Sequence, residues 1–150
     1  MSARPFERLV RSERSSSLLI FDASAAIELV LDRPAAQLIA QDLRRGAPMV
    51  MPAHFEADGY AGLRRMVRHR DIDRDELERA LPRLMNVPGE RVPLAPLLPH
   101  AYALFDRVGA YDAFYVVLAQ LQGAALLTAD GPLARAAEAL GVTVLLRQSR

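Results

Sequence analysis

Strand-like apolar runs alternate with helix-like segments at both ends of this chain, and this alternation limits its fold more than any other feature. A strand, a helix and a second strand favour a parallel sheet, because the crossover helix returns the chain to the same edge. We therefore predict an α/β domain with a mainly parallel central sheet flanked by helices, and a helical insertion in the middle. The strand-like runs are residues 18–21, 48–51, 125–128 and 142–146.

Proline, glycine and capping residues indicate where the helices begin and end. Pro34 opens a helix that Gly46 ends, because proline suits the first helical position and glycine the residue after the last. Either Asp71 or Asp73 can cap a further helix by accepting hydrogen bonds from its free backbone N–H groups. The segment 97–108 shows the apolar pattern of another helix.

The beginning of the chain differs from the rest. Residues 1–16 contain four arginines and no sustained apolar period, so we expect them to form a flexible basic tail. The chain has 150 residues in all, which suffices for one substantial core and is too short for two ordinary domains. We therefore predict a single domain over residues 17–150.

Composition excludes several classes of site. The chain has no cysteine, which excludes a disulfide framework, a thiol nucleophile and a cysteine-based zinc site. It has no apolar run of the roughly 18 residues that a membrane span needs, and its start lacks the apolar core of a signal peptide, so we expect a soluble cytoplasmic protein. The formal net charge is only +1. Any attraction to nucleic acid must therefore be local.

Four aspartates stand where apolar runs give way to helix-like segments. In an open α/β sheet, residues that follow parallel strands meet in the crevice beyond the carboxyl ends of those strands. Carboxylates about 4 Å apart repel by roughly 1 to 4 kcal/mol per pair, so such a cluster requires a cation. Mg²⁺ or Mn²⁺ suits oxygen ligands, and this chemistry points to metal-assisted phosphodiester hydrolysis. The four residues are Asp22, Asp58, Asp112 and Asp130.

The surrounding residues resemble a known family. Leu-Ile-Phe-Asp22-Ala-Ser24-Ala and the stretch from Pro52 to Gly-Leu63-Arg64-Arg65 are similar to the first two motifs of the PIN domain, and in particular of VapC-type toxins. Two later stretches are similar to its third and fourth motifs, and the resemblance covers about residues 18–146. They are Tyr111-Asp112-Ala-Phe-Tyr-Val-Val-Leu-Ala and Leu-Leu-Thr128-Ala-Asp130-Gly-Pro-Leu-Ala-Arg135-Ala.

The resemblance implies a fold and a function. It implies a three-layer PIN-like nuclease domain and an endoribonuclease that uses Mg²⁺ or Mn²⁺ as the toxin of a type II toxin–antitoxin system. It also implies a homodimer, a small cognate antitoxin as partner, and a tRNA or a structured rRNA loop as substrate. The catalytic and metal-binding residues would be Asp22, Asp58, Asp112 and Asp130, with Ser24 and Thr128 orienting a ligand or its water.

One position departs from the family pattern. The second acidic position usually holds glutamate, and alignment on Pro52 and Leu63 places Asp58 there. Glu56 stands two residues earlier, which is about 200° around a helix, so Glu56 and Asp58 cannot both face the site. The register favours Asp58, whose shorter side chain either binds metal through water or needs a closer backbone. Activity could be reduced.

Several of these residues also have simpler interpretations. Asp22 and Asp130 could simply be helix N-caps with no role in a site. Ser24 and Thr128 could likewise serve in caps or turns. His54 lies four residues before Asp58 and could pair with it as a ligand, although a histidine without a site role is the commoner case. Arg64, Arg65 and Arg68 could follow an RNA backbone, or could be a solvated helix end that the helix dipole stabilises.

Two other functions remain open at this stage. A PIN-like RNA- or protein-binding module with weak catalysis would keep the fold, with Asp58 as the lesion. A phosphatase or small-molecule hydrolase with an aspartate nucleophile is less consistent with the residues, because Asp22-Ala-Ser lacks a second acid two residues on.

Overall fold

A computed structural model describes residues 18–149, so the predicted tail over residues 1–16 lies outside the described residues. The described chain contains a sheet in the order β3-β2-β1-β4-β5, and all four pairings of neighbouring strands are parallel. The predicted parallel α/β sheet is therefore confirmed. The strands are β1 (Leu19–Phe21), β2 (Met49–Pro52), β3 (Glu90–Val92), β4 (Ala125–Thr128) and β5 (Val144–Leu146).

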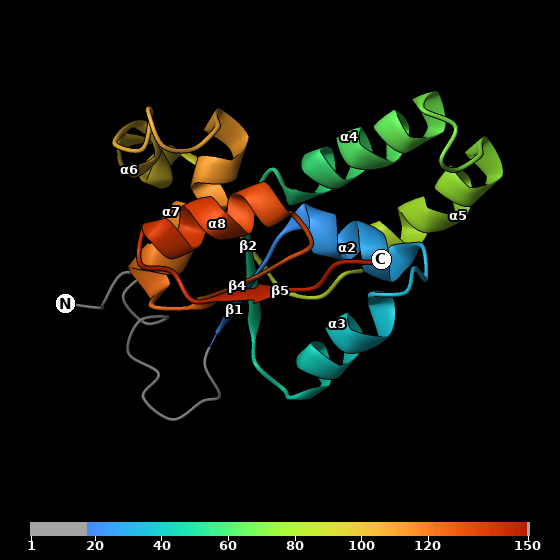
Figure 1. Cartoon of the computed structure of the whole chain (residues 1–150), viewed down its shortest axis with the longest axis horizontal. Helices are drawn as coiled ribbons and strands as arrows, with labels where there is room; N and C mark the ends of the chain where they lie inside the picture. Colours follow the sequence, from blue (N-terminus) through green and yellow to red (C-terminus); the bar gives the residue numbers. More distant parts are fainter. Residues whose placement is uncertain (1–17, 150) are drawn as a thin grey trace.

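Helices cover both faces of this sheet, which gives the three layers (Figure 1). One face carries α2 (Ala23–Val30), α3 (Ala36–Arg44), α4 (Phe55–Arg68) and α5 (Arg74–Met85). The other carries η1 (Ala95–Leu97), α6 (Leu98–Tyr102), α7 (Ala110–Gln122) and α8 (Gly131–Ala139). Within residues 18–149, no helix has the length and apolar character that a membrane span requires.

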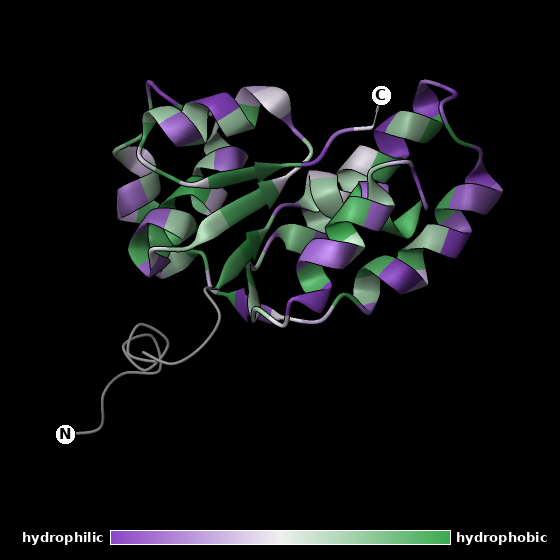
Figure 2. Cartoon of the chain, turned by 60° about the horizontal axis from the view of Figure 1, so that its bottom comes forward, coloured by the Kyte–Doolittle hydropathy of each residue, from purple (hydrophilic) through white to green (hydrophobic). Residues whose placement is uncertain are grey.

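The core lies on both sides of the sheet because side chains alternate along each strand. Ile20 and Leu126 point into the core under α7 and α8, whereas their neighbours Phe21 and Leu127 point into the core under α2 to α5. All four side chains are fully buried. Figure 2 shows the strands as a hydrophobic layer, with hydrophilic positions on the helices around it.

Local signals explain most helix ends. Asp73 caps α5 in a reciprocal capping box with Glu76, which decides between the two predicted capping residues. Gly46 follows α3 with φ +81°, a backbone conformation that suits glycine. The segment 97–108 is not one helix. Helix α6 ends at Tyr102, and turns closed by hydrogen bonds between residues three apart carry the chain on towards α7.

The strand order creates a crevice at the carboxyl end of the sheet. Strand β1 lies in the middle, with β2 on one side and β4 on the other. The connection that follows β1 runs over one face of the sheet, and the helix that follows β4 lies on the other. In open α/β sheets this change of direction leaves a gap beyond the strand ends, where ligands commonly bind.

Candidate functional site

A pocket of about 560 Å³ opens at this crevice and collects the four predicted aspartates. Asp22 follows β1 and Asp130 follows β4. Asp58 lies in the first turn of α4, and Asp112 lies in the first turn of α7. Asp112 comes after a helical segment and not directly after a strand, so α7 brings it to the crevice from the side. Other residues that line the pocket are Ser24, His54, Arg65 and Tyr111.

Two hydroxyls hold the Asp22 carboxylate. The Ser24 hydroxyl donates to Asp22 Oδ2 at 2.5 Å, and the Thr128 hydroxyl donates to the same oxygen at 2.7 Å. The oxygens of these hydroxyls accept in turn from the backbone N–H groups of Ala129 and Asp130. Each hydroxyl has one proton, so this network fixes Oδ2 and leaves Oδ1 for a ligand. Ser24 also lines the pocket, whereas Thr128 is fully buried behind it.

Burial and repulsion by neighbouring acids raise the pKa of two carboxylates of the pocket, Asp22 and Asp112. Burial, together with the nearby charges of Asp112 and Asp130, raises the pKa of Asp22 to about 6, although the Ser24 and Thr128 hydrogen bonds oppose this. Burial also raises the pKa of Asp112, and the charges of Asp130 and Asp58 add to the effect. The pocket therefore holds negative charge that an approaching cation would neutralise.

The capping interpretation holds for one aspartate and not for the other. Asp130 Oδ1 accepts from the Leu133 backbone N–H at 3.1 Å, so this residue caps α8 while it lines the pocket. Asp22 occupies the N-cap position of α2, but its side chain makes no capping hydrogen bond to the backbone of that helix. Its carboxylate is only 4% exposed and is turned towards Ser24 and Thr128 instead.

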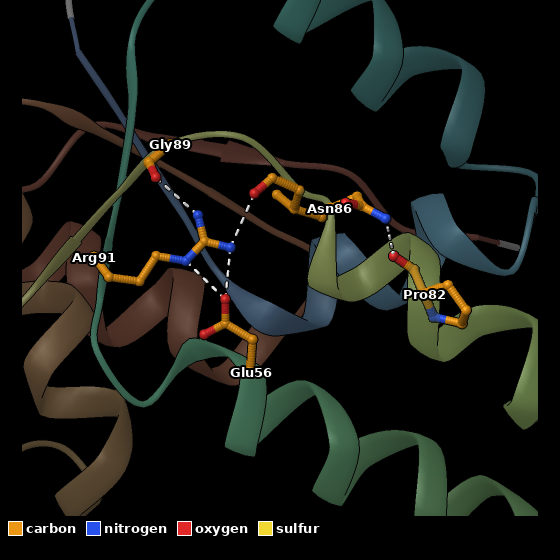
Figure 3. A network of polar contacts seen from close by, with 6 residues as sticks. Glu56, Pro82, Asn86, Gly89 and Arg91 are labelled. Carbon is orange, nitrogen blue, oxygen red and sulfur yellow. Dashed lines mark hydrogen bonds and ion pairs between the residues drawn. The ribbon is translucent and has the colours of Figure 1, made fainter.

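Glu56 and Asp58 point in different directions, as the helical spacing predicted. Figure 3 shows Glu56 paired with Arg91, whose Nε lies 2.7 Å from Glu56 Oε1. The same guanidinium donates to the carbonyl groups of Gly89 and Val87, so this cluster ties α4 to the chain around β3. Asp58 lines the pocket and Glu56 does not. The role of Asp58 as a ligand stays a prediction.

His54 is a part of the site whose contacts the sequence did not predict. Its Nε2 lies 3.1 Å from Asp58 Oδ2 and 3.0 Å from the Tyr111 carbonyl oxygen. Burial lowers the pKa of His54, but Asp58, the Tyr111 carbonyl and the charge of Asp112 outweigh it and raise the pKa overall. The i, i+4 spacing of His54 and Asp58 was the available signal. The contact with Tyr111 depends on where α7 packs. The spacing of His54 and Asp58 along the chain gives no information about that packing.

Tyr115 also belongs to the site without having been singled out. It is fully buried in α7, and its hydroxyl has no hydrogen-bond partner in the described chain. Burial raises the pKa of this hydroxyl, and the charges of Asp22 and Asp58 raise it further, which places the phenol near both carboxylates. Asp58 and the Ala23 backbone also act on this pKa as hydrogen-bonding groups, so the hydroxyl lies close to both, although neither contact meets the full geometry of a hydrogen bond.

The three predicted RNA-binding arginines extend from the rim of the pocket. Arg64, Arg65 and Arg68 are exposed on the second half of α4, and within residues 18–149 none of them forms an ion pair. Arg65 lines the carboxylate pocket and also a neighbouring hollow of about 490 Å³ that Arg64, Arg68 and Tyr60 share. A continuous surface therefore leads from the acidic pocket onto a basic helix face.

The donor chemistry of the pocket fits a hard divalent cation. Four carboxylates line one cavity, and Asp22 keeps one oxygen free of hydrogen bonds from Ser24 and Thr128. In the part of the chain that the structure describes, no three His, Asp or Glu side chains are grouped closely enough to hold an ion together. A cation in this pocket would therefore be held by one or two carboxylates and by water, a mode of binding that Mg²⁺ commonly uses.

Comparison with known proteins gives consistent matches. The family model of the PIN domain matches residues 19–139. Ribonuclease VapC12 of Mycobacterium tuberculosis is 36% identical over 118 residues, which cover 79% of this chain and 91% of that protein. Ribonuclease VapC3 of the same organism is 39% identical over 121 residues, covering 79% of this chain and 86% of that protein.

A solved structure supports the same fold. The crystal structure of VapBC2 from Rickettsia felis, bound to a DNA fragment from their promoter, matches with a TM-score of 0.60. The sequence identity is 10%, and the match covers 87% of this chain and 98% of that one. At this identity the likeness concerns the fold alone.

Proposed function

The chain belongs to the PIN domain family, and from this we propose that it is a metal-dependent endoribonuclease that acts as the toxin of a type II toxin–antitoxin pair. It hydrolyses RNA phosphodiester bonds with Mg²⁺ or Mn²⁺ at the carboxylate pocket. Its relatives are named ribonucleases, which supports the hydrolase class. The substrate is a tRNA or an rRNA.

One observation carries this proposal: carboxylates from four separate segments line a single pocket. Asp22 and Asp130 come from the chain after neighbouring central strands, and Asp58 and Asp112 come from helices on opposite faces of the sheet. Such convergence is costly in an apolar environment and has no structural benefit for Asp22, which caps no helix. Strongly perturbed carboxylates gathered in a cleft are characteristic of functional sites.

Each residue of the pocket has a defined task in this proposal. A divalent cation, when bound, supplies a water of lowered pKa and neutralises charge that develops on the phosphate. Ser24 and Thr128 hold Asp22 so that one oxygen faces the cavity. Asp112 presents its carboxylate from the first turn of α7, and Asp58 does so from α4.

The basic face of α4 would bind the substrate beside the pocket. Arg65 stands on the rim next to the carboxylates, and Arg64 and Arg68 continue the surface along the helix. Their guanidinium groups lack acidic partners in residues 18–149, so they remain available to phosphate oxygens. RNA whose backbone lies along this face would place a phosphate at the acidic pocket.

The test is cleavage of total tRNA and rRNA by the purified protein with Mn²⁺, with Mg²⁺ and with EDTA. We expect cutting at discrete sites with either metal and none with EDTA. Asp112→Asn should abolish cutting, because it removes one carboxylate charge from the pocket. Asp75→Asn is the matched control, since Asp75 is exposed in the first turn of α5 and outside the pocket. Equal cutting by Asp112→Asn and wild type would refute the role of the carboxylate pocket in cleavage, and no cutting with either metal would refute the nuclease assignment.

The alternative of a weakly catalytic binding module has one supporting observation, the aspartate at position 58. A shorter carboxylate reaches less far into the pocket, and Asp58→Glu restores the family's usual residue. If Asp58 is a lesion, Asp58→Glu should raise cleavage well above that of the wild type. RNA binding without metal-dependent turnover in either protein would make the module the better description.

The remaining assignments concern partners and location. We propose a small cognate antitoxin, a homodimer and a cytoplasmic location. The structural relative from Rickettsia felis is described as a VapBC pair, which supports an antitoxin partner. Co-expression with the product of a neighbouring small gene, followed by size-exclusion chromatography, tests both the complex and the dimer.

A further inference from the structure

The two ring nitrogens of His54 differ in their surroundings: Nε2 faces two acceptor oxygens, and Nδ1 faces none. Nε2 lies 3.0 Å from the Tyr111 carbonyl oxygen and 3.1 Å from Asp58 Oδ2. Both of these atoms only accept hydrogen bonds when Asp58 is ionised, so Nε2 must carry a proton. Nδ1 is buried and has no partner in the described chain. The surroundings therefore select an imidazole that donates from Nε2.

The aromatic residues around the ring fix its orientation. The ring centroids of Phe114 and Tyr115 lie 5.3 and 5.2 Å from that of His54, and the ring of Tyr111 lies 6.0 Å away. All three belong to α7, whereas His54 immediately precedes α4. The His54 side chain is only 9% exposed. A ring packed in this way has little freedom to turn its donor elsewhere.

The Nε2–H group therefore links the two helices that carry Asp58 and Asp112. It contacts Asp58 directly, and it holds the carbonyl of Tyr111, the residue before Asp112. Asp58 has the shorter side chain at a position where related proteins usually have glutamate. One donor that holds both the Asp58 carboxylate and the first turn of α7 would keep Asp58 and Asp112 facing the pocket.

We propose that His54 is a positioning residue, which orients the Asp58 carboxylate and anchors the first turn of α7 beside it so that both acids face the cation. The part that concerns the cation rests on the proposed function. The contact between His54 and Asp58 does not, because it exists in the chain itself. A purely structural histidine would only fill space between α4 and α7.

Two variants separate these roles. His54→Leu keeps an apolar side chain but removes the donor. His54→Gln places an amide nitrogen the same number of bonds from Cα as Nε2, so it can restore the donor. We expect His54→Leu to weaken Mn²⁺ binding, measured by electron paramagnetic resonance, by about tenfold. His54→Gln should stay within about threefold of the wild type. His100→Leu is the control, because His100 is exposed in α6.

A double-mutant cycle with Asp58→Asn tests whether His54 acts through Asp58. In that background, His54→Leu should cause a clearly smaller further loss of Mn²⁺ affinity, because the carboxylate that His54 orients is gone and only its contact with the Tyr111 carbonyl remains to be lost. An equal loss in both backgrounds, or a Gln variant as weak as the Leu variant, would overturn the proposal. Circular dichroism on each variant confirms that the compared proteins are folded.

A metal-independent measurement separates the two hypotheses. The chain has three histidines, so long-range ¹H–¹⁵N spectra of the histidine-labelled wild type are readily assigned. At about pH 9, where imidazoles are neutral, His54 should be in the Nε2–H form. The Nδ1–H form would overturn the positioning role. If the wild type binds no Mn²⁺, the metal proposal fails and this spectrum alone decides the role of His54.

Discussion

Asp22 is the most constrained ionisable residue of the pocket. Its carboxylate is buried, and one of its oxygens accepts two hydroxyl protons. Even so, its pKa is raised from 3.8 to about 6, so burial and the neighbouring acids outweigh the two hydrogen bonds. The ionised Asp22 carboxylate therefore destabilises the folded chain, and the proposed cation would offset this cost.

This imbalance has a direct effect on stability without metal. Between the unfolded pKa of 3.8 and the folded pKa of about 6, the folded chain binds more protons at Asp22 than the unfolded chain does. The free energy of unfolding in EDTA should therefore fall as the pH rises through this range, by up to about 3 kcal/mol. Above about pH 6 the loss is complete.

Asp22→Asn should remove this loss, because the amide stays neutral. We expect the variant to be more stable than the wild type by about 1 to 3 kcal/mol at neutral pH in EDTA, and nearly equal to it at about pH 4. Urea unfolding across this pH range measures both values. A variant that is less stable than the wild type at neutral pH would contradict the interpretation.

At the scale of single residues, the sequence predicted the acids of the pocket and the two hydroxyls, Ser24 and Thr128, that hold Asp22, but not the contacts of His54 with Tyr111 or the place of Tyr115. Helical spacing was enough to separate Asp58 from Glu56, because that question concerns one helix. The contacts of His54 and Tyr115 depend on how α7 packs against α4 and β1. Such packing is a property of the assembled layers, and the spacing of residues within a single segment cannot predict it.

Helix α4 combines a structural half and an exposed basic half. Phe55 and Leu63 are fully buried under it, while Arg64, Arg65 and Arg68 project outwards. This arrangement follows from its amphipathic sequence, so the helix and its basic end were both predictable. The continuity of its basic face with the acidic pocket depends on the position of the pocket itself.

Replacing all three of these arginines with glutamine should weaken RNA binding through the loss of phosphate contacts. If each arginine contacts one phosphate, the slope of log K against log salt should decrease by about 2 for single-stranded RNA. Fluorescence anisotropy with a labelled RNA, at several salt concentrations and with Asp112→Asn to prevent cleavage, measures this slope. Replacement of Arg79, which is exposed in α5, is the control. An unchanged slope would show that the RNA lies elsewhere.

Close packing of α4 against α2 depends on Gly62. A Cβ added there would overlap Ile27 Cδ1, and both residues line the pocket. Gly62→Ala should be nearly neutral in stability, because the end of Ile27 can move and alanine favours a helix by about 1 kcal/mol. Gly62→Leu should cost about 2 kcal/mol and reduce cleavage, because it separates Asp58 from Asp22. Thermal unfolding and the cleavage assay measure both effects in the two variants. If Gly62→Ala and Gly62→Leu behaved equally, the packing role of Gly62 would be contradicted.

Element boundaries were predictable where glycine or a capping residue set them, as at the end of α3 and the start of α5. Pro34 was predicted to open α3, but it lies in the turn before this helix, which begins at Ala36. The segment 97–108 was not, because its apolar pattern also suits turns that pack on a core. Leu97 and Ala101 are buried there, whereas Tyr102 and Phe105 are largely exposed. Periodicity reports which face is apolar, and it does not report whether the backbone continues as a helix.

On the scale of the whole molecule, alternation predicted a parallel sheet but not the strand order. The order β3-β2-β1-β4-β5 requires the chain to cross the sheet between β3 and β4, through the helices of the middle segment. Only this crossing brings the acids of the two halves to one crevice. Sequence motifs located these acids, and the topology explains why they meet.

Binding of a divalent cation should stabilise the whole domain. The carboxylates repel one another in the folded chain and are far apart in the unfolded one, so a cation binds the folded form preferentially. At Mn²⁺ concentrations about 100 times the dissociation constant, the gain should be about 2.7 kcal/mol. Thermal unfolding with Mn²⁺ and with EDTA measures it. Asp112→Asn should lose most of the shift, and an identical shift in that variant would place the ion elsewhere.

Because the pocket lies between the two helical layers, its acids are made at widely separated times during synthesis of the chain. Asp22 and Asp58 belong to helices on one face of the sheet, whereas Asp112 and Asp130 come with α7 and α8 on the other. Asp130 is the last of them to be synthesised, after more than four fifths of the 150 residues. A nascent chain therefore lacks a complete pocket until the segment that carries Asp130 has left the exit tunnel, so the proposed activity would begin only after nearly the whole domain has been made.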